Sequence, residues 1–414
     1  MRLVPIYIDP GTGSMLFVLL LTILSVVRYF IKNIILKLKT AICFTNRDTQ
    51  KNIIPIAIFA EDKRYWKVFN PVCRELNARG IAFTYFTTSS DDPIFDCDYE
   101  HMTATLLSKG NKAYAKLNFL KATILISSTP GLDVYQWKRS CDVQCYIHML
   151  HAASDVTLYR MFGLDYYDVI LLSGEYQACD IRSLESIRGL PQKELIQIGI
   201  PYMDDILKHV SLKTINDTTT ILLAPSWGSN SLFNVYGDKL IQCLIDTGYN
   251  IIIRPHPQSL ISEKEMLDKL IRKFKESDTL IWNFDEDNQN VLQKSDILIS
   301  DFSGVIFDFA LVYDKPIIYS CKDFNIDAYD AWWLNKLPWT FNILPQIGCE
   351  ITFENISNIK QVIDNCMFDD KYKVGRDRAR QETWSHQRDG AKLAVDYIVK
   401  KYNDLTKTTS EIGV

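Results

Sequence analysis

From residue 53 onward the chain alternates between two kinds of hydrophobic pattern. Short continuous apolar runs rich in β-branched residues predict buried strands, and runs with apolar positions every three or four residues predict helices. In the first half the predicted strands are 53–59, 81–86, 122–127, 143–148 and 169–173, with a helix at 65–77. Because buried strands that alternate with helices form parallel sheets, the pattern predicts a βαβ fold.

The alternation resumes after residue 220. Predicted strands at 221–224, 249–253, 279–283, 296–300 and 315–319 alternate with predicted helices at 236–247, 262–276, 288–293 and 303–312. A polar stretch at 211–219 marks the expected boundary between the two halves.

The two halves together predict an α/β protein of the GT-B type, in which two Rossmann-like domains face each other across a cleft. We place an N-terminal acceptor domain at 50–214 and a C-terminal donor domain at 218–385. A C-terminal helix at 386–404 is expected to pack back on the first domain.

The N-terminus carries a different pattern. Residues 15–27 form an apolar run without an ionisable residue, and four cations follow: Arg28, Lys32, Lys37 and Lys39. The run is shorter than the roughly 20 residues that cross a bilayer, so a short anchor, an interfacial helix, a cleaved signal and a helix packed on the protein's own core all compete. A signal is disfavoured because its cations would precede the apolar run. We predict a membrane-associated segment at 1–45, with the rest of the chain at the cytoplasmic face of the membrane.

Composition and charge exclude several classes of protein. With 414 residues, of which 47% are hydrophobic, the chain is neither disordered nor a single small module. Its net charge of −4 argues against nucleic acid as a partner. Ten cysteines without a CxxC pair fit reduced thiols better than disulfides or a zinc site. Neither a GxGxxG fingerprint nor a P-loop is present, which disfavours dinucleotide and Walker-type ATP chemistry.

The first candidate motif, RPHPQ at 254–258, directly follows a predicted strand. Its two prolines hold an extended turn, so Arg254 and His256 are expected to point into the cleft. A planar guanidinium and an imidazole are suitable donors for diphosphate oxygens. The alternative is an ordinary strand-end loop with a surface histidine.

The second motif, SDFSGV at 300–305, lies between a predicted strand and a predicted helix. Ser303 is a natural N-cap and Gly304 allows close approach to the first helical amides, a combination that favours a phosphate. Ser300 is assigned to the same site. Asp301 either caps the local turn or orients the histidine of the first motif or a ribose. Asp308 either stabilises the helix or reaches ligand hydroxyls.

The third motif, YIHMLHA at 146–152, contains two histidines three residues apart. They could bind a metal, but no matching carboxylate or cysteine pattern lies nearby, so we expect no metal. A general base is the preferred interpretation, because the unperturbed pKa of histidine lies near neutral pH. We favour His151 over His148, which suits a core position if the strand continues to Ile147. Tyr329, Asp330 and Trp332 are weaker site candidates, since such aromatic clusters mostly serve packing.

Several further segments join these motifs in one order along the chain: TPGLD at 129–133, LSGEY at 172–176, GIPY at 199–202, YDAWW at 329–333 and HQRDG at 386–390. Together they resemble the CDP-glycerol glycerophosphotransferase family of teichoic-acid and related polymer enzymes. The resemblance implies a GT-B fold, a CDP-activated alcohol as donor, and peripheral attachment to the inner membrane face. It also implies that His151 is the histidine of the acceptor domain, and that Arg254, His256, Ser303 and Gly304 form the donor-phosphate site. The chain departs from the family pattern at Ala152, where glycine is common, and at Ser303-Gly304, where a serine pair is common.

These observations predict a transferase that moves glycerol phosphate, or a related polyol phosphate, from a CDP-activated donor to a hydroxyl acceptor and releases CMP. His151 would deprotonate the acceptor, and the donor loops would stabilise charge on the leaving CMP without a metal or other cofactor. The expected partners are the anionic inner leaflet and a lipid-linked or polymer acceptor in cell-wall synthesis. The alternatives are a GT-B glycosyltransferase that builds a surface polysaccharide from a nucleotide sugar, and a non-catalytic scaffold.

Overall fold

The computed structural model describes Thr22, Val27 and residues 53–153, 155–210, 218–285, 287–321 and 324–411. Residues 54–414 form one compact unit that holds both sheets, and residues 1–53 form a separate unit. The predicted membrane segment at 1–45, apart from Thr22 and Val27, and most of the predicted boundary at 211–219 lie outside the described residues. Within the described residues, no helix is both long and apolar enough to cross a membrane.

The first sheet has seven parallel strands in the order β3-β2-β1-β4-β5-β6-β7. The strands are β1 (Ile54–Ala60), β2 (Phe83–Thr87), β3 (Met102–Leu106), β4 (Ala122–Ser127), β5 (Val143–Met149), β6 (Val169–Leu172) and β7 (Glu194–Gln197). All five predicted strands are confirmed, whereas β3 and β7 were not predicted from the sequence. Both lie at a sheet edge and are half-exposed, so they lack the continuous apolar run of a buried strand.

The second sheet has six parallel strands in the order β10-β9-β8-β11-β12-β13. They are β8 (Thr220–Leu223), β9 (Asn250–Ile253), β10 (Leu280–Trp282), β11 (Ile297–Ile299), β12 (Ile317–Tyr319) and β13 (Gly348–Glu350). Both sheets reverse their strand order once, at β1 and β4 in the first and at β8 and β11 in the second. In doubly wound folds ligands bind at the carboxyl ends of the strands beside such a reversal.

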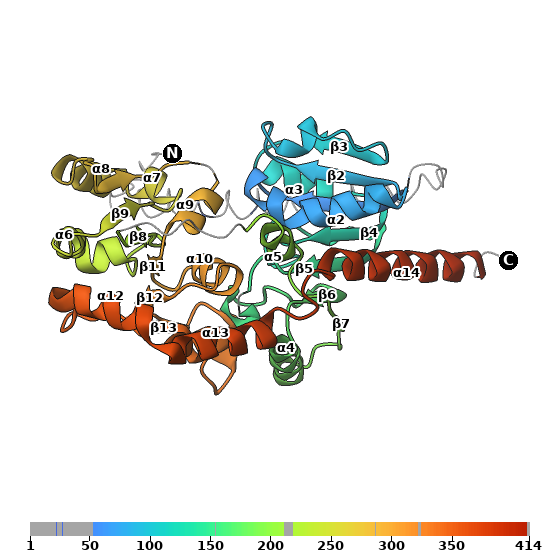
Figure 1. The fold of residues 1–414 in the computed structure, drawn as a ribbon. Helices are drawn as coiled ribbons and strands as arrows, with labels where there is room; N and C mark the ends of the chain where they lie inside the picture. Colours follow the sequence, from blue (N-terminus) through green and yellow to red (C-terminus); the bar gives the residue numbers. More distant parts are fainter. Residues whose placement is uncertain are drawn as a thin grey trace, which may run out of the picture. The chain divides into compact units, whose positions relative to one another are not determined.

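Helices connect the strands (Figure 1). The first sheet carries α2 (Trp66–Ala78), α3 (Asn111–Leu117), α4 (Glu175–Arg188) and α5 (Pro201–Leu207). The later helices are α6 (Leu232–Ile245), α7 (Ser259–Ser262), α8 (Lys264–Lys273), α9 (Gln289–Lys294), α10 (Val305–Phe307), α11 (Trp339–Ile347), α12 (Ile359–Phe368), α13 (Asp370–Thr383) and α14 (Gly390–Glu411).

Three predicted helices differ in detail. The helix predicted at 262–276 corresponds to α8, and the separate short helix α7 precedes it. The helix predicted at 236–247 begins earlier, at Leu232, with a kink at Gly237. The helix predicted at 303–312 is a short α10 followed by the π-helical turn Asp308–Val312.

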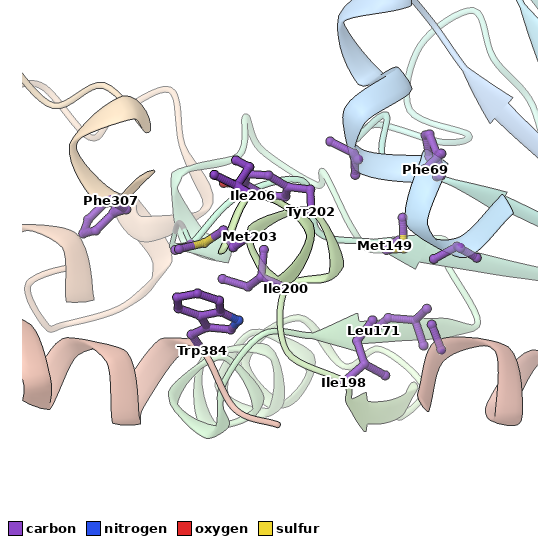
Figure 2. Close-up of a cluster of buried hydrophobic side chains, with 14 of the residues drawn as sticks. Phe69, Met149, Leu171, Ile198, Ile200, Tyr202, Met203, Ile206, Phe307 and Trp384 are labelled. Carbon is purple, nitrogen blue, oxygen red and sulfur yellow. The ribbon is translucent and has the colours of Figure 1, made fainter. Parts of the chain in front are cut away.

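A shared hydrophobic cluster joins the two sheets. Figure 2 shows Tyr202 and Met203 of α5 with Phe307 of α10 and Trp384, which follows α13. All four side chains are at most 3% exposed. Because one cluster buries residues of both halves, the sheets are held together by core packing as well as by the connecting chain.

The chain passes from the second half back to the first just after α13. The backbone N–H and the Oγ of Ser385 both donate to the carbonyl of Ser173, at 3.1 and 2.8 Å. A Cβ on Gly174 would lie 1.9 Å from the Glu382 carbonyl oxygen, and one on Gly199 would lie 2.0 Å from that of Ser385. These glycines therefore make room for the crossing chain. Beyond it α14 packs against α2 and β4 (Figure 1).

Candidate active site

Two histidines at the end of β5 lie on either side of one tyrosine hydroxyl. His148 is fully buried within β5, and His151 is half-buried just beyond the strand. The hydroxyl of Tyr159 is 3.3 Å from Nε2 of His148 and 3.3 Å from Nδ1 of His151. Of the two histidines, only His151 is therefore open to a reactant.

Burial keeps both imidazoles neutral. Desolvation first, and the positive charge of Lys67 second, lower the pKa of His151 to about 4. Desolvation also holds the pKa of His148 well below its usual value. The ring of Tyr65 stands edge-on to that of His151, with 5.6 Å between centroids. A neutral imidazole keeps one nitrogen without a hydrogen, so His151 can accept a proton near neutral pH.

The loop after β9 fixes the tautomer of His256. The backbone N–H of Gln258 donates to Nδ1 of His256 at 3.1 Å. Because Nδ1 accepts a hydrogen bond, the neutral ring carries its hydrogen on Nε2. Burial, and then the charge of Arg64, lower the pKa of His256. His256 therefore offers a neutral N–H donor, which suits a phosphate oxygen.

Arg254 lies in the same loop and is bonded to the loop after β10. Its guanidinium donates to the side-chain oxygen of Asn283 and, at 2.7 Å, to the carbonyl of Asp285. Burial lowers its pKa, while the nearby carboxylates of Asp285 and Asp287 act in the opposite direction. Arg254 thus fixes the position of one loop against the other, with a half-buried side chain two residues before His256.

Ser300 and Asp301 are fully buried at the end of β11. The hydroxyl of Ser300 donates to the carbonyl of Ala224 at 2.6 Å. The Asp301 carboxylate accepts from the backbone N–H of Ser226 at 2.8 Å and from the first residue of α6 at 3.4 Å. Burial raises the pKa of Asp301 to about 6. Both side chains join the loops after β8 and β11, and within the described residues neither is hydrogen-bonded to His256.

The turn at Ser303 and Gly304 adjoins the histidine segment of the first half. A Cβ on Gly304 would lie 4.0 Å from the Cβ of Ala152, the residue after His151. Asp308, one turn further on, is buried and accepts a hydrogen bond from the hydroxyl of Tyr202 in α5. Burial raises the pKa of Asp308. Asp308 therefore connects the two halves through Tyr202.

Asp330 is buried in a polar contact between the halves. Its carboxylate accepts from the backbone N–H of Phe162 at 2.8 Å and pairs with Arg188, which also binds Asp165 at 2.7 Å. Arg188 lies over the ring of Phe162, 5.0 Å from its centroid. The ring of Trp332 is exposed next to this contact. Asp330 thus has a structural role in this arrangement.

Four residues near the histidines are absent from the predicted site: Tyr65, Tyr159, Arg64 and Lys67. Arg64 and Lys67 are three residues apart near the start of α2, a spacing that could have suggested a shared face. Tyr159 follows His151 by eight residues in an irregular loop, and no periodic signal connects the two. Among the described residues, no three His, Cys, Asp or Glu side chains are grouped so that they could hold a metal ion.

The sequence pattern of the family described as CDP-glycerol:poly(glycerophosphate) glycerophosphotransferase matches residues 166–400. The match includes the loops that carry Arg254, His256, Ser303 and Gly304 and ends within α14. Among curated proteins, none matches the sequence at a significant level.

Solved structures share the fold. The wall teichoic acid polymerase TagF, a histidine-to-asparagine variant with CDPG, is 18% identical, with a TM-score of 0.55 over 90% of this chain and 96% of that one. MnaA of S. aureus with UDP is 12% identical, with a TM-score of 0.57 over 84% and 96%. A glycosyltransferase of Rickettsia africae is also 12% identical, with a TM-score of 0.53 over 86% and 99%. At these identities the likeness concerns the fold alone.

Proposed function

This chain belongs to the CDP-glycerol:poly(glycerophosphate) glycerophosphotransferase family, and we propose that it transfers glycerol phosphate, or a related polyol phosphate, from a CDP-activated donor to a hydroxyl acceptor. The observation that carries the proposal is the family match over 166–400, because this range contains both loops of the proposed donor site. The products would be an acceptor extended by one phosphodiester and CMP.

The donor diphosphate would bind between the loops after β9 and β11. His256 supports this position because its Nε2–H is a neutral donor held in place by Gln258. Arg254 adds positive charge in the same loop, and Gly304, an exposed residue, directly precedes the short helix α10. These groups would stabilise the charge that grows on the leaving CMP, the role that Mg²⁺ has in many phosphotransferases.

The acceptor would be activated by His151. His151 is half-buried and directly precedes Ala152, whose Cβ would lie 4.0 Å from a Cβ on Gly304, so a base and the donor phosphates would share one site. In the proposed step the acceptor oxygen attacks the phosphorus that bears the polyol, its proton moves to Nε2 of His151, and the bond from phosphorus to the CMP oxygen breaks. No covalent intermediate on the protein is needed.

The acceptor is proposed to be a lipid-linked or polymeric chain of cell-wall synthesis at the cytoplasmic face of the membrane. The apolar run at 15–27 and the cations that follow it support a membrane location. The name of TagF, a wall teichoic acid polymerase of the same fold, supports a polymer as product.

A donor screen tests the proposal. Purified enzyme is supplied with CDP-glycerol, CDP-ribitol and UDP-sugars, and release of CMP is compared with release of UDP. We expect CMP from a CDP-polyol and no UDP, with turnover retained in EDTA. UDP release alone would replace the proposal with a glycosyltransferase. Activity that is lost in EDTA and restored only by Mg²⁺ or Mn²⁺ would refute the metal-independent mechanism.

A further inference from the structure

Tyr159 lies where it contacts both histidines of the first half. Its hydroxyl is 3.3 Å from Nε2 of His148 and 3.3 Å from Nδ1 of His151. Its ring stands edge-on to His148, with 5.5 Å between centroids. The carbonyl of Tyr159 accepts from the backbone N–H of Asp330 at 2.9 Å, so the second half of the chain fixes its backbone. Tyr159 therefore lies between the rings of His148 and His151, and the hydrogen bond from Asp330 holds its backbone there.

The number of hydrogens on the two imidazoles and the phenol determines which group donates in each of the two hydrogen bonds. If Nε2 of His151 is to accept a proton, that nitrogen must be bare and Nδ1 must carry the hydrogen of the neutral ring. Nδ1–H then donates to the hydroxyl oxygen of Tyr159. A phenol has a single hydrogen, so Tyr159 donates it to Nε2 of His148. The remaining hydrogen of His148 is then on Nδ1.

We propose that Tyr159 and His148 are positioning residues that hold His151 in the Nδ1–H tautomer and so leave its Nε2 bare for the proton of the acceptor. The proposal rests on the proposed function, in which His151 is the base. Neither positioning residue touches the reacting atoms. Both act through the ring of His151.

Two aromatic rings pack against His148. His148 is fully buried, and its Nδ1 makes no hydrogen bond with any described residue. The ring of Tyr167 packs against it in a T-shaped arrangement, with 4.9 Å between centroids. The hydroxyl of Tyr159 and the rings of Tyr159 and Tyr167 contact His148, and the nearby His151 acts on it electrostatically.

A neutral His148 is required for the arrangement. A protonated His148 would donate through Nε2 to Tyr159, whose own hydrogen would then turn toward Nδ1 of His151 and leave His151 in the unproductive tautomer. Desolvation keeps the pKa of His148 well below its usual value, and the neighbouring His151 acts in the same direction. The buried histidine can therefore remain an acceptor throughout the neutral pH range.

The test compares Tyr159→Phe with Tyr167→Phe. Both variants remove one hydroxyl from the same aromatic cluster, but the hydroxyl of Tyr167 donates to the carbonyl of Thr129 at 2.6 Å and, among the described residues, is not hydrogen-bonded to either histidine. ¹⁵N NMR of histidine-labelled protein reports the tautomer of each ring, and the chain has only six histidines. The resonances of His151 are identified from their absence in His151→Ala.

We expect Nδ1–H at His151 in the wild type and in Tyr167→Phe, and a mixture with Nε2–H in Tyr159→Phe. With CDP-glycerol as donor, Tyr159→Phe should lose about 10- to 100-fold in kcat while the KM for the donor is retained, and Tyr167→Phe should keep kcat. An Nε2–H tautomer in the wild type, or a tautomer unchanged in Tyr159→Phe, would overturn the proposal. Because the NMR measurement needs no donor, a protein with the expected tautomers that releases no CMP would refute the proposed function and still support the Nδ1–H tautomer that Tyr159 and His148 hold at His151.

Discussion

His151 and His256 would differ in function because different hydrogen-bond partners fix different tautomers of the two imidazoles. Nδ1 of His256 accepts from a backbone N–H, so its Nε2 carries hydrogen and can donate. Nδ1 of His151 faces a tyrosine hydroxyl instead, which permits the opposite tautomer. The sequence indicates both histidines through their positions after predicted strands. It could not indicate their tautomers, because these depend on Gln258 and Tyr159.

The first prediction concerns the base. His151→Ala should lower turnover by about 10² to 10⁴ while binding of the donor is retained, because the ring contributes proton transfer and not donor contacts. Steady-state kinetics with CDP-glycerol and calorimetric binding of the donor measure the two effects. His148→Ala serves as the comparison, and a greater loss in that variant than in His151→Ala would transfer the role of base to His148.

The second prediction concerns pH. An unperturbed histidine would lose its function as a base as the pH falls through 6.5, but the pKa of His151 is lowered to about 4, chiefly by burial. The neutral, active form therefore persists at all pH values well above 4. We therefore expect the protonation of His151 to cause no change in kcat/KM between about pH 6 and 8.

Lys67→Met provides the matched variant for this measurement. Removal of its positive charge should raise the pKa of His151 and move the acidic limb of the profile toward higher pH. An acidic limb of the wild-type kcat/KM profile centred near pH 6.5 would contradict the lowered pKa of His151. A limb that does not move in Lys67→Met would show that Lys67 does not lower this pKa.

At the scale of elements, the sequence predicts the central strands of both described sheets well, whereas of their four edge strands it predicts β10 and misses the other three. The strands at the centre of each sheet are apolar on both faces, and they were predicted within a few residues of their ends. Strands β3, β7 and β13 lie at sheet edges with mixed exposure, so their apolar signal is weak. Helix α13 consists mostly of charged residues. Its few apolar side chains therefore give little helical periodicity from which the helix could be predicted.

The third prediction concerns the crossing after α13. In Gly199→Ala the new Cβ would lie 2.0 Å from the Ser385 carbonyl oxygen, at a residue whose φ is +82°. The chain must shift there, so we expect a loss of about 3 kcal/mol or more in the free energy of unfolding. Urea denaturation followed by circular dichroism measures it.

Gly248→Ala isolates the backbone contribution to that loss. Gly248 has a similar φ of +75°, but nothing lies within 4 Å of a Cβ placed there. This variant should lose only about 1–2 kcal/mol, the strain of a left-handed residue. Equal losses in the two variants would show that the contact with Ser385 is not rigid.

At the scale of the molecule, one hydrophobic cluster and several polar contacts connect the two sheets. Tyr202 joins α5 to Asp308, and Asp330 joins the second half to Arg188. The sequence suggested Asp308 and Asp330 as ligand contacts or structural carboxylates, and it could not choose, because their partners lie more than 100 residues away. Residues next to a predicted strand end, such as His151, could be identified from the sequence. The role of a side chain such as Asp308 or Asp330 could not be identified in this way, because it depends on a partner that is distant in the sequence.

The last prediction concerns the N-terminal segment. Residues 54–414 form a compact unit of their own, so deletion of residues 1–45 should leave a folded enzyme that still acts on a soluble acceptor analogue. The apolar run at 15–27 and the cations that follow it should together bind anionic membranes, each cation near the surface adding about 1 kcal/mol. The truncated protein should therefore no longer sediment with anionic vesicles, whereas the full chain should.

Two variants of the full chain separate the two contributions to membrane binding. Replacement of Arg28, Lys32, Lys37 and Lys39 by glutamine should weaken binding to anionic vesicles more than to neutral ones, because only the electrostatic part is removed. Two serines introduced into the apolar run should weaken binding to both kinds of vesicle. A truncated protein that cannot fold would instead assign the segment to the core. A truncated protein that folds and still binds vesicles would move the membrane contact to the compact unit, whose exposed Trp332 would then be the first residue to substitute.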